Sequence, residues 1–238
     1  MANIVYKDFL LYFSGARVHR YYLATGRRKN KAKELYKANL EVAKAFHPLL
    51  GVLEVVMRNR INEILTHYFG DPDWIQNQRA GFMNDPSLVY YSNGRRIVNE
   101  FLKKEVNKAI RKLQQKRSTV TSNKIVAEQT FGFWTEMFEA HIYRLVGGRP
   151  IHIFGNLPPH KQRSDIRDEL LKIRMFRNRI NHNEPVCFVG DSIDFSETRA
   201  VYNAIIHILN WIDPKLLGYI ASIDEVHARI TAAERIYY

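Results

Sequence analysis

The segment from Arg174 to Pro185 contains the side chains best suited to chemistry, and it reads RMFRNRINHNEP. Three arginines, three asparagines and one histidine stand in it beside residues typical of a protein core. Arg177 lies four residues after Ile173 and three before Ile180, so the three share one face of a helix. An arginine on an apolar face is costly unless it is paired or faces a cleft. The segment therefore indicates a paired arginine or a polar cleft at this point.

Histidine and arginine together suit the cleavage of a phosphodiester. His182 can remove or donate a proton near neutral pH. Arg177 presents a planar fork of donors to phosphate oxygens and stabilises charge that builds in the transition state. RNA carries its own nucleophile, the 2′-hydroxyl group. These residues predict RNA cleavage by internal attack, which leaves a cyclic phosphate and needs no metal.

The spacing of the two residues limits how they can meet. Positions five apart on an ideal helix differ by about 140°, so Arg177 and His182 converge only partly within one chain. The site could be completed by Asn178, one turn before His182, or by the same helix of a second copy across a two-fold axis. A third candidate is a polar stripe that contains Glu54 and Arg58. The alternative account of that stripe is an i,i+4 ion pair worth about 0.3–0.5 kcal/mol.

The chain is strongly basic, with 36 Lys and Arg against 24 Asp and Glu and a formal net charge of +12. Such an excess makes a polyanion, above all a nucleic acid, the first partner to expect. Two basic patches are candidates for contacts with RNA phosphates; they consist of Arg27, Arg28 and Lys29, and of Lys104, Lys108 and Arg111. The alternative for both patches is a solvated helix face without a partner.

Several function classes have no support in the sequence. The single cysteine, Cys187, excludes a disulfide within the chain and a thiolate zinc site, and its apolar neighbours predict a buried thiol. No signal-peptide pattern and no run of about 20 apolar residues occurs, so we expect a cytoplasmic protein without membrane contact. Phosphate-loop, dinucleotide-binding and zinc-protease motifs are missing, so no cofactor and no metal are expected. The histidines without paired ligand spacing are expected to be structural: His47, His67, His141, His152, His160, His207 and His227.

Apolar periodicity predicts an all-α fold with one domain over residues 1–238, in which residues 70–130 form an inserted lid or a basic helical subdomain. The aromatic residues of 131–134 fall at helical spacing with further apolar residues, which favours core packing over a cofactor site. A small hairpin is expected near Val186–Phe195. The expected helices cover residues 14–24, 32–46, 49–69, 95–117, 131–146, 160–183, 197–211 and 215–236, and residues 118–128 open another.

An ordered set of short motifs accompanies Arg177 and His182. These motifs are Leu35-Tyr36 with Asn39, Leu53-Glu54 followed by Arg58-Asn59, Phe131-Gly132-Phe133-Trp134, and Trp211-Ile212-Asp213-Pro214. Together with the R-x4-H spacing, the set resembles the Abi-like (AbiD/AbiF) abortive-infection branch of the HEPN superfamily of helical ribonucleases. The resemblance covers nearly the whole chain.

The resemblance implies a HEPN-like helical bundle that forms a homodimer, with paired R-x4-H motifs making one metal-independent ribonuclease centre. Arg177 and His182 would take the catalytic positions with Asn178 beside them, and Glu54, Arg58 and Asn59 would support them. Members of this branch are toxins or phage-defence effectors, and some pair with a small non-coding RNA; a protein antitoxin is the alternative partner.

Two other readings remain open. One is a non-cleaving protein that holds a structured RNA in the same cleft; the other is a helical interaction protein whose polar residues pair internally. Control by a nucleotidyltransferase is not implied, because Asn183 and Glu184 follow His182 where proteins silenced in that way carry a tyrosine.

Overall fold

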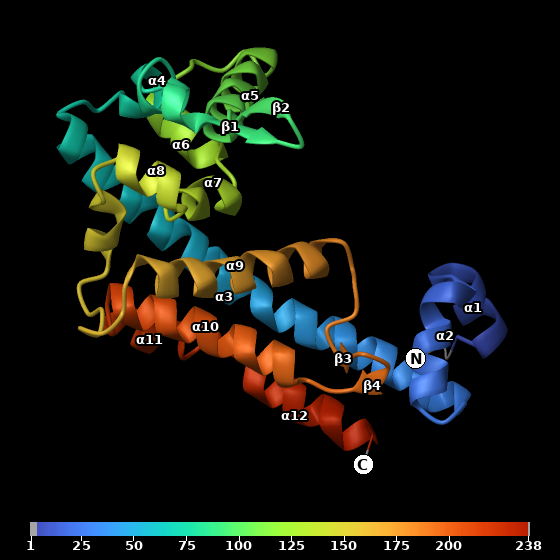
Figure 1. Ribbon diagram of the computed structural model, residues 1–238. Helices are drawn as coiled ribbons and strands as arrows, with labels where there is room; N and C mark the ends of the chain where they lie inside the picture. The colour runs from blue at the N-terminus through green and yellow to red at the C-terminus, as the bar shows by residue number, and fades with distance from the viewer. Residues whose placement is uncertain (1–3, 238) are drawn as a thin grey trace. The chain divides into compact units, whose positions relative to one another are not determined.

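The computed structural model describes residues 4–237 and shows an all-α protein, as the sequence predicts. Over these residues it has twelve α-helices, three short 3-10 helices and two antiparallel hairpins of two strands each (Figure 1). No helix within this range is both long and apolar enough to cross a membrane. The chain divides into two compact units.

The first unit comprises Met1–Val52, Met175–His207 and Lys215–Tyr238. Its elements are α1 (Tyr6–Phe13), α2 (Gly15–Ala24), the first part of α3 (Lys29–Phe69), the end of α9 (Arg163–Asn181), β3 (Phe188–Val189), β4 (Ser192–Ile193), most of α10 (Ser196–Ile212), α11 (Lys215–Ile220) and α12 (Val226–Tyr237). Phe46 of α3 packs on Phe176 of α9 with ring centroids 4.6 Å apart. Tyr21 of α2 lies 5.1 Å from both Tyr36 and Phe188. These buried rings join the N-terminal helices to the segment that follows α9.

The second unit comprises Leu53–Arg174 and Ile208–Pro214. Besides parts of α3, α9 and α10, its elements are α4 (Trp74–Asn77), η1 (Phe82–Asn84), η2 (Pro86–Leu88), β1 (Val89–Ser92), β2 (Arg95–Val98), α5 (Phe101–Gln115), α6 (Ser122–Glu128), α7 (Phe131–Glu136), α8 (Ala140–Leu145) and η3 (Arg149–Ile153). Its part of α3 buries one residue per turn along a single stripe, at Leu53, Met57, Ile61 and Leu65. The rings of Phe131, Phe133 and Trp134 are buried, as predicted from their spacing.

Helix α3 runs unbroken through Pro48, so the predicted break between two helices at this proline is wrong. A proline inside a helix deprives the carbonyl four residues earlier, here that of Lys44, of its donor and costs about 3 kcal/mol. Pro48 and Lys44 are both exposed, so water can satisfy that carbonyl. Phe46 and Leu49 beside them are 0% exposed, and burying each side chain contributes about 1.5–3 kcal/mol. Packing therefore outweighs the local cost of the proline.

The helix predicted over residues 95–117 starts too early, because residues 95–98 form strand β2. β1 and β2 pair in a register that runs from Val89↔Val98 to Ser92↔Arg95. Asn93 and Gly94 connect the strands, with φ of +50° and +73°. Asn-Gly is the preferred pair for such a two-residue turn, since both positions need positive φ. Asn93-Gly94 in the sequence indicates this hairpin, but the basic residues that follow it were assigned to the predicted helix.

The single helix predicted over residues 131–146 is divided into α7 and α8. Glu139 is extended, with φ −68° and ψ 138°, and ends the helical run. Arg163 donates from Nη1 to the carbonyl of Phe138 at 2.6 Å. The carbonyl of Phe138 thus has a side-chain donor in place of a helical amide. This contact with Arg163, 25 residues later, lies at the break between α7 and α8.

The C-terminal helix predicted over residues 215–236 is also divided, into α11 and α12. The carboxylate of Asp224 accepts the amide of Val226, the first residue of α12, at 3.1 Å. An acidic side chain that accepts such an early amide favours a helix start. The predicted small hairpin near Val186–Phe195 is confirmed as β3 and β4.

Candidate functional site

Helix α9 ends in a hydrogen-bonded cap that fixes the segment with the candidate catalytic residues. Asn183 adopts the left-handed conformation, with φ +54°. Its amide donates to the carbonyl of Ile180 at 3.0 Å, and the amide of Glu184 donates to the carbonyl of Arg179 at 2.9 Å. This pair of bonds is the Schellman arrangement, in which asparagine can replace the usual glycine. The backbone around His182 is therefore held in place at the helix end.

Side chains from other elements of the first unit hold the loop that follows this cap. Asn39 of α3 is 2% exposed, and its Oδ1 accepts the amide of Val186 at 2.7 Å. The hydroxyl of Thr198 donates to the carbonyl of the same Val186. Arg17 of α2 donates from Nη1 to the carbonyl of Asn183 at 3.0 Å. The motif residue Asn39 thus positions the backbone after α9.

Arg177, Asn178 and His182 lie on the last turns of α9 or directly after it. Arg177 is half-buried, whereas Asn178 and His182 are exposed. The backbone amide of His182 donates to the carbonyl of Asn178 at 3.0 Å, which places the two residues one turn apart. Within residues 4–237, neither the imidazole of His182 nor the side-chain amide of Asn178 has a hydrogen bond or an ion pair. Both side chains are therefore available to a ligand.

Cys187, five residues after the exposed His182, is buried. Its side chain is 0% exposed, as predicted for a buried thiol. Burial raises the pKa of the thiol to about 12. A thiol at this pKa is almost wholly protonated at neutral pH and is a poor nucleophile. Cys187 is therefore a core residue of the first unit.

Glu54, Arg58 and Asn59, predicted to support the catalytic pair, belong to the second unit. Glu54 and Arg58 are half-buried and Asn59 is exposed. Arg58 donates from Nη1 to the carbonyl of Ala127 at 3.4 Å, a contact inside its own unit. The candidate catalytic residues Arg177, Asn178 and His182 belong to the first unit.

The basic patch of Arg27, Arg28 and Lys29 surrounds the turn between α2 and α3. Arg27 has φ +60°, and Arg28 donates from Nε to the carbonyl of Thr25 at 2.9 Å. The ammonium group of Lys29 lies 5.6 Å from the ring centroid of Tyr6. The side chain of Arg28 and the backbone of Arg27 thus take part in closing the turn, and all three residues are exposed.

The other predicted patch lies on the outer face of α5. At about 100° per residue, Lys104, Lys108 and Arg111 fall within an arc of about 60°. The buried residues Leu102, Val106, Ala109 and Leu113 occupy the opposite side. The side chains of Lys104 and Lys108 are each 70% exposed, although they pair with Glu100 at 3.1 Å and Glu105 at 3.6 Å. Such exposed pairs are weak, so both lysines can exchange their partners for phosphate.

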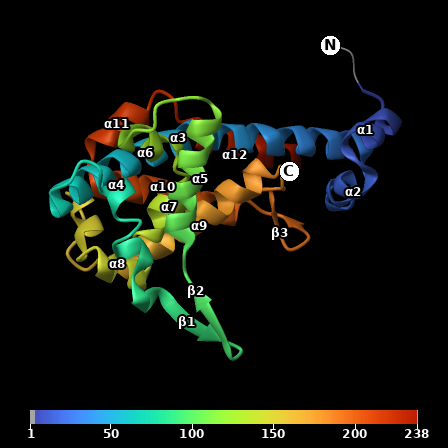
Figure 2. The ribbon, with the colours of Figure 1, turned by 90° about the horizontal axis from the view of Figure 1, so that it is seen from above.

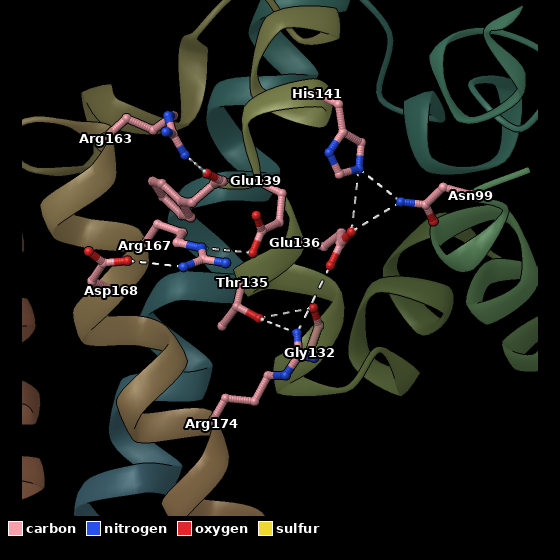
Figure 3. A network of polar contacts seen from close by, with 11 residues as sticks. Asn99, Gly132, Thr135, Glu136, Glu139, His141, Arg163, Arg167, Asp168 and Arg174 are labelled. Atoms are coloured by element: carbon pink, nitrogen blue, oxygen red, sulfur yellow. Dashed lines mark hydrogen bonds and ion pairs between the residues drawn. The ribbon is translucent and has the colours of Figure 1, made fainter. Parts of the chain in front are cut away.

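A polar network that no sequence motif predicted lies in the second unit (Figure 3). Glu136 of α7, with a side chain 14% exposed, is its centre. Its carboxylate lies 3.7 Å from Nε2 of His141 and 4.0 Å from Nη1 of Arg174, and it accepts Nδ2 of Asn99 at 3.4 Å. Three segments distant in sequence meet at this carboxylate, at residue 99, at residues 136–141 and at residue 174. Arg174 connects this network to the segment 174–185.

The same network fixes the orientation of His141. Oδ1 of Asn99 accepts the amide of Phe101 at 3.2 Å, which orients the Asn99 side chain at the start of α5. Its Nδ2 therefore faces Nε2 of His141, at 2.8 Å. Asn99 and the carboxylate of Glu136 thus both lie beside Nε2 of His141. These side chains satisfy one another, which fits the structural role expected for His141.

A second part of the network joins α9 to the segment between α7 and α8. Arg167 donates from Nε to Glu139 at 3.0 Å and from Nη1 to Asp168 at 3.1 Å (Figure 3). Thr135 accepts Nη1 of Arg174 at 3.4 Å and donates to the carbonyl of Gly132 at 3.1 Å. The motif of residues 131–134 thus leads directly into these polar contacts.

Two further features concern ligands. Within residues 4–237, no group of three or more His, Cys, Asp and Glu side chains is placed to hold a metal ion. An open cavity of about 1170 Å³ in the second unit is lined by residues that include His67, Tyr68, Arg149 and His152. The guanidinium group of Arg149 lies 5.0 Å from the ring centroid of Tyr68. None of the predicted site residues lines this cavity.

Comparison of the chain with protein-family models, with curated proteins and with solved structures found no match. The resemblance to the Abi-like HEPN ribonucleases therefore depends on the sequence motifs alone.

Proposed function

We propose that this protein is a metal-independent endoribonuclease of the HEPN type, which acts as a toxin or phage-defence effector. The observation that carries the proposal is the exposed imidazole of His182, which has no partner within residues 4–237 and stands on a capped helix end. Asn178 is exposed one turn before it, and Arg177 lies on the same turn. A histidine, an arginine and an amide at one helix end are the groups that internal attack on a phosphodiester requires.

In the proposed reaction, the imidazole of His182 accepts the proton of a ribose 2′-hydroxyl. The 2′-oxygen then attacks the adjacent phosphorus, and the bond from phosphorus to the 5′-oxygen breaks. Arg177 stabilises the added negative charge on the phosphate oxygens, and the side-chain amide of Asn178 donates to one of them. The leaving 5′-oxygen takes up a proton from solvent water, and His182 returns its proton to solvent. The products are a 2′,3′-cyclic phosphate and a 5′-hydroxyl.

The proposed active form is a homodimer in which the α9 ends of two copies form one centre. One helix brings Arg177 and His182 together only partly, since about 140° separates their directions. A two-fold axis lets Arg177 of one copy face His182 of the other. Glu54, Arg58 and Asn59 would position the substrate. The proposed neutralising partner is a small non-coding RNA, which fits the net charge of +12, and a protein antitoxin is the alternative.

A second candidate function is RNA binding without cleavage. The exposed basic face of α5 supports it, because Lys104, Lys108 and Arg111 lie on one side of the helix and could follow a phosphate backbone. Under this alternative, RNA affinity survives the loss of His182 and no cleavage products form.

The test is expression in bacteria of the wild type, His182→Ala and His160→Ala, with growth and RNA ends measured together. His160 is also exposed and has no side-chain partner within residues 4–237, so it is a matched control. The wild type and His160→Ala are expected to slow growth and to produce 2′,3′-cyclic phosphate ends, and His182→Ala to do neither. Intact RNA in all three cultures, with equal growth, would reject the ribonuclease.

A further inference from the structure

The hairpin of β1 and β2 presents an exposed aromatic ring. Tyr91 is 72% exposed, the most exposed of the tyrosines for which exposure is described. The hairpin extends from the N-terminal end of α5, and only Asn99 and Glu100 connect the two (Figure 2). A two-stranded hairpin without a third strand has little core of its own. An exposed ring in such a place contributes nothing to a core and is free to contact a ligand.

The pairing register puts a cation beside this ring. Tyr91 lies directly opposite Arg96 in the ladder, so both side chains are on one face, with Cβ atoms about 4.5–5.5 Å apart. Arg96 is exposed as well. Val98, two residues along β2, is 38% exposed and shares that face. The face therefore combines an aromatic ring, a guanidinium group and an aliphatic surface.

The hairpin and α5 also concentrate the positive charge of the chain. Residues 89–117 contain nine Lys and Arg and two Glu, which gives a net charge of +7 out of the total of +12. Both glutamates are paired with exposed lysines, Glu100 with Lys104 and Glu105 with Lys108. Within residues 4–237, no carboxylate pairs with Arg96 or Arg111. More than half of the net charge thus lies in about an eighth of the chain.

The basic helix α5 follows the hairpin directly in the chain, after Asn99 and Glu100. The 15 residues of α5 span about 22 Å at 1.5 Å per residue. The four residues of β2 add about 13 Å at 3.3 Å per residue. A polyanion bound along both elements would contact Lys104, Lys108 and Arg111 on the helix, and Arg96 and Tyr91 on the hairpin. This order places phosphate contacts on the helix and a ring contact at the hairpin.

We propose that the hairpin of β1 and β2, together with the outer face of α5, is a binding surface for unpaired RNA, on which Tyr91 stacks against a base and the cations contact phosphates. Single-stranded nucleic acids are bound by this combination of stacking aromatic rings and a basic track. A duplex hides the faces of its bases, and a polyanion without bases offers no ring to stack. The surface is distinct from the residues proposed for cleavage and does not require that reaction.

The test measures the binding of a labelled oligouridine of about 12 nucleotides, within the usual range of single-strand sites, by fluorescence anisotropy. All proteins are the full chain with His182→Ala, so that RNA stays intact whether or not the proposed cleavage occurs. Tyr91→Ala is expected to weaken binding about 5- to 100-fold, and Tyr91→Phe, which keeps the ring, to restore it. Tyr219→Ala is the matched control, because Tyr219 of α11 is 70% exposed and is expected to leave affinity unchanged.

The charge contribution is tested in the same assay by varying salt. Substitution of Lys104, Lys108 and Arg111 by Gln is expected to lower the slope of log affinity against log salt by about 2, since three phosphate contacts are lost. The same change at the exposed residues Lys7, Lys44 and Arg235 keeps the total charge equal. Those residues lie outside both predicted basic patches, so the slope is expected to stay unchanged.

Several outcomes would overturn the proposal. Duplex RNA or heparin bound as tightly as the single strand, with the same loss in Tyr91→Ala, would show a general polyanion surface. Equal losses in Tyr91→Ala and Tyr219→Ala would remove the stacking role. Single-stranded DNA is expected to bind with the same dependence on Tyr91, because its bases present the same faces.

Discussion

His182 and His141 belong to two regions that use the same residue types in opposite ways. Around His141, the side chains of Asn99, Glu136 and Arg174 bind one another and close a network within the second unit. At the end of α9 in the first unit, His182 faces solvent without a partner within residues 4–237. A histidine engaged on one nitrogen by its neighbours is held in place, whereas an unengaged one can exchange protons with a ligand.

The residue type alone therefore does not distinguish a structural histidine from one that can act on a ligand. The distinction comes from whether the side chain already has hydrogen-bond partners in the fold. Burying a carboxylate such as Glu136 is costly unless partners compensate. The polar groups of that region therefore stabilise the fold. The end of α9 obtains its rigidity from backbone bonds of the cap, which leaves the side chains of Asn178 and His182 without partners within residues 4–237. Five predictions test this division, in order of decreasing effect.

The largest effect is expected on RNA cleavage. His182→Ala is expected to lower the cleavage rate by about 10²- to 10⁴-fold, because a proton acceptor is lost, with little change in melting temperature. His141→Ala is expected to do the reverse, lowering the melting temperature and keeping cleavage. The measurement is cleavage of a labelled RNA, together with thermal unfolding. The division fails if His141→Ala abolishes cleavage at an unchanged melting temperature.

The next effect concerns Cys187, buried five residues after the exposed His182. Its pKa, raised by burial to about 12 from an ordinary 9.0, lowers the thiolate fraction at pH 8 by about 10³. Alkylation by iodoacetamide is therefore expected to be slow in the native protein and fast in urea. The folded state keeps the proton longer, so the stabilisation is complete below pH 9 and is lost as pH rises through about 12. Rapid native alkylation at pH 8 would contradict this placement.

Asn39→Ala removes the acceptor of the Val186 amide, which is then left without a partner. The expected loss is about 2 kcal/mol of unfolding free energy, since an unsatisfied buried donor costs about 1–3 kcal/mol. Urea unfolding followed by circular dichroism measures it. Asn178→Ala is the matched control, because its exposed amide has no partner within residues 4–237; its expected change is under about 0.5 kcal/mol. Equal losses in both variants would remove the structural role of Asn39.

Glu136→Gln weakens the centre of the polar network. We expect a loss of about 1–2 kcal/mol, because hydrogen bonds and an ion pair of a mostly buried carboxylate are lost. Glu63→Gln provides the comparison, since Glu63 is 66% exposed and pairs with Arg60 at 2.5 Å; its expected effect is under about 0.5 kcal/mol. Chemical denaturation of both proteins measures the difference. A Glu136→Gln protein as stable as the wild type would mean that the network does not support the fold.

The smallest effect is a gain. Gly51 lies inside α3, is exposed, and has open space where a Cβ would be added. Gly51→Ala is therefore expected to raise the unfolding free energy by about 0.5–1 kcal/mol, mainly by lowering the entropy of the unfolded chain. Gly147→Ala is expected to destabilise, because φ is +61° and an added Cβ would lie 2.7 Å from the hydroxyl of Tyr68. Thermal unfolding of the two variants should move in opposite directions.

The sequence predicted the features that depend on local chemistry. Apolar periodicity predicted the all-α fold, and Pro185 placed the end of α9 within two residues of its observed last residue, Asn181. Local rules also misled: Pro48 predicted a break that the burial of its neighbours prevents. Asn93-Gly94 carried a valid hairpin signal, which the surrounding basic residues led us to read as part of a loop before a helix.

The polar network could not be predicted, for a different reason. Glu136, His141, Asn99 and Arg174 have no spacing that links them, because tertiary packing alone brings their segments together. Asn39 was visible as a motif residue, but its partner Val186 lies 147 positions later in the chain. A sequence shows which residues could act, and the fold decides which of them are already engaged.

The exposed turn of the hairpin is also the place where we expect proteases to cleave the protein in a cell extract. Arg95 and Arg96 are exposed beside the Asn93-Gly94 turn, and small exposed turns are preferred sites of proteolytic nicking. Trypsin is expected to cut there early and to leave two fragments held together by the helices of the second unit. A preparation nicked in this way would melt normally and yet lack an intact β2, so gel analysis should precede any binding measurement.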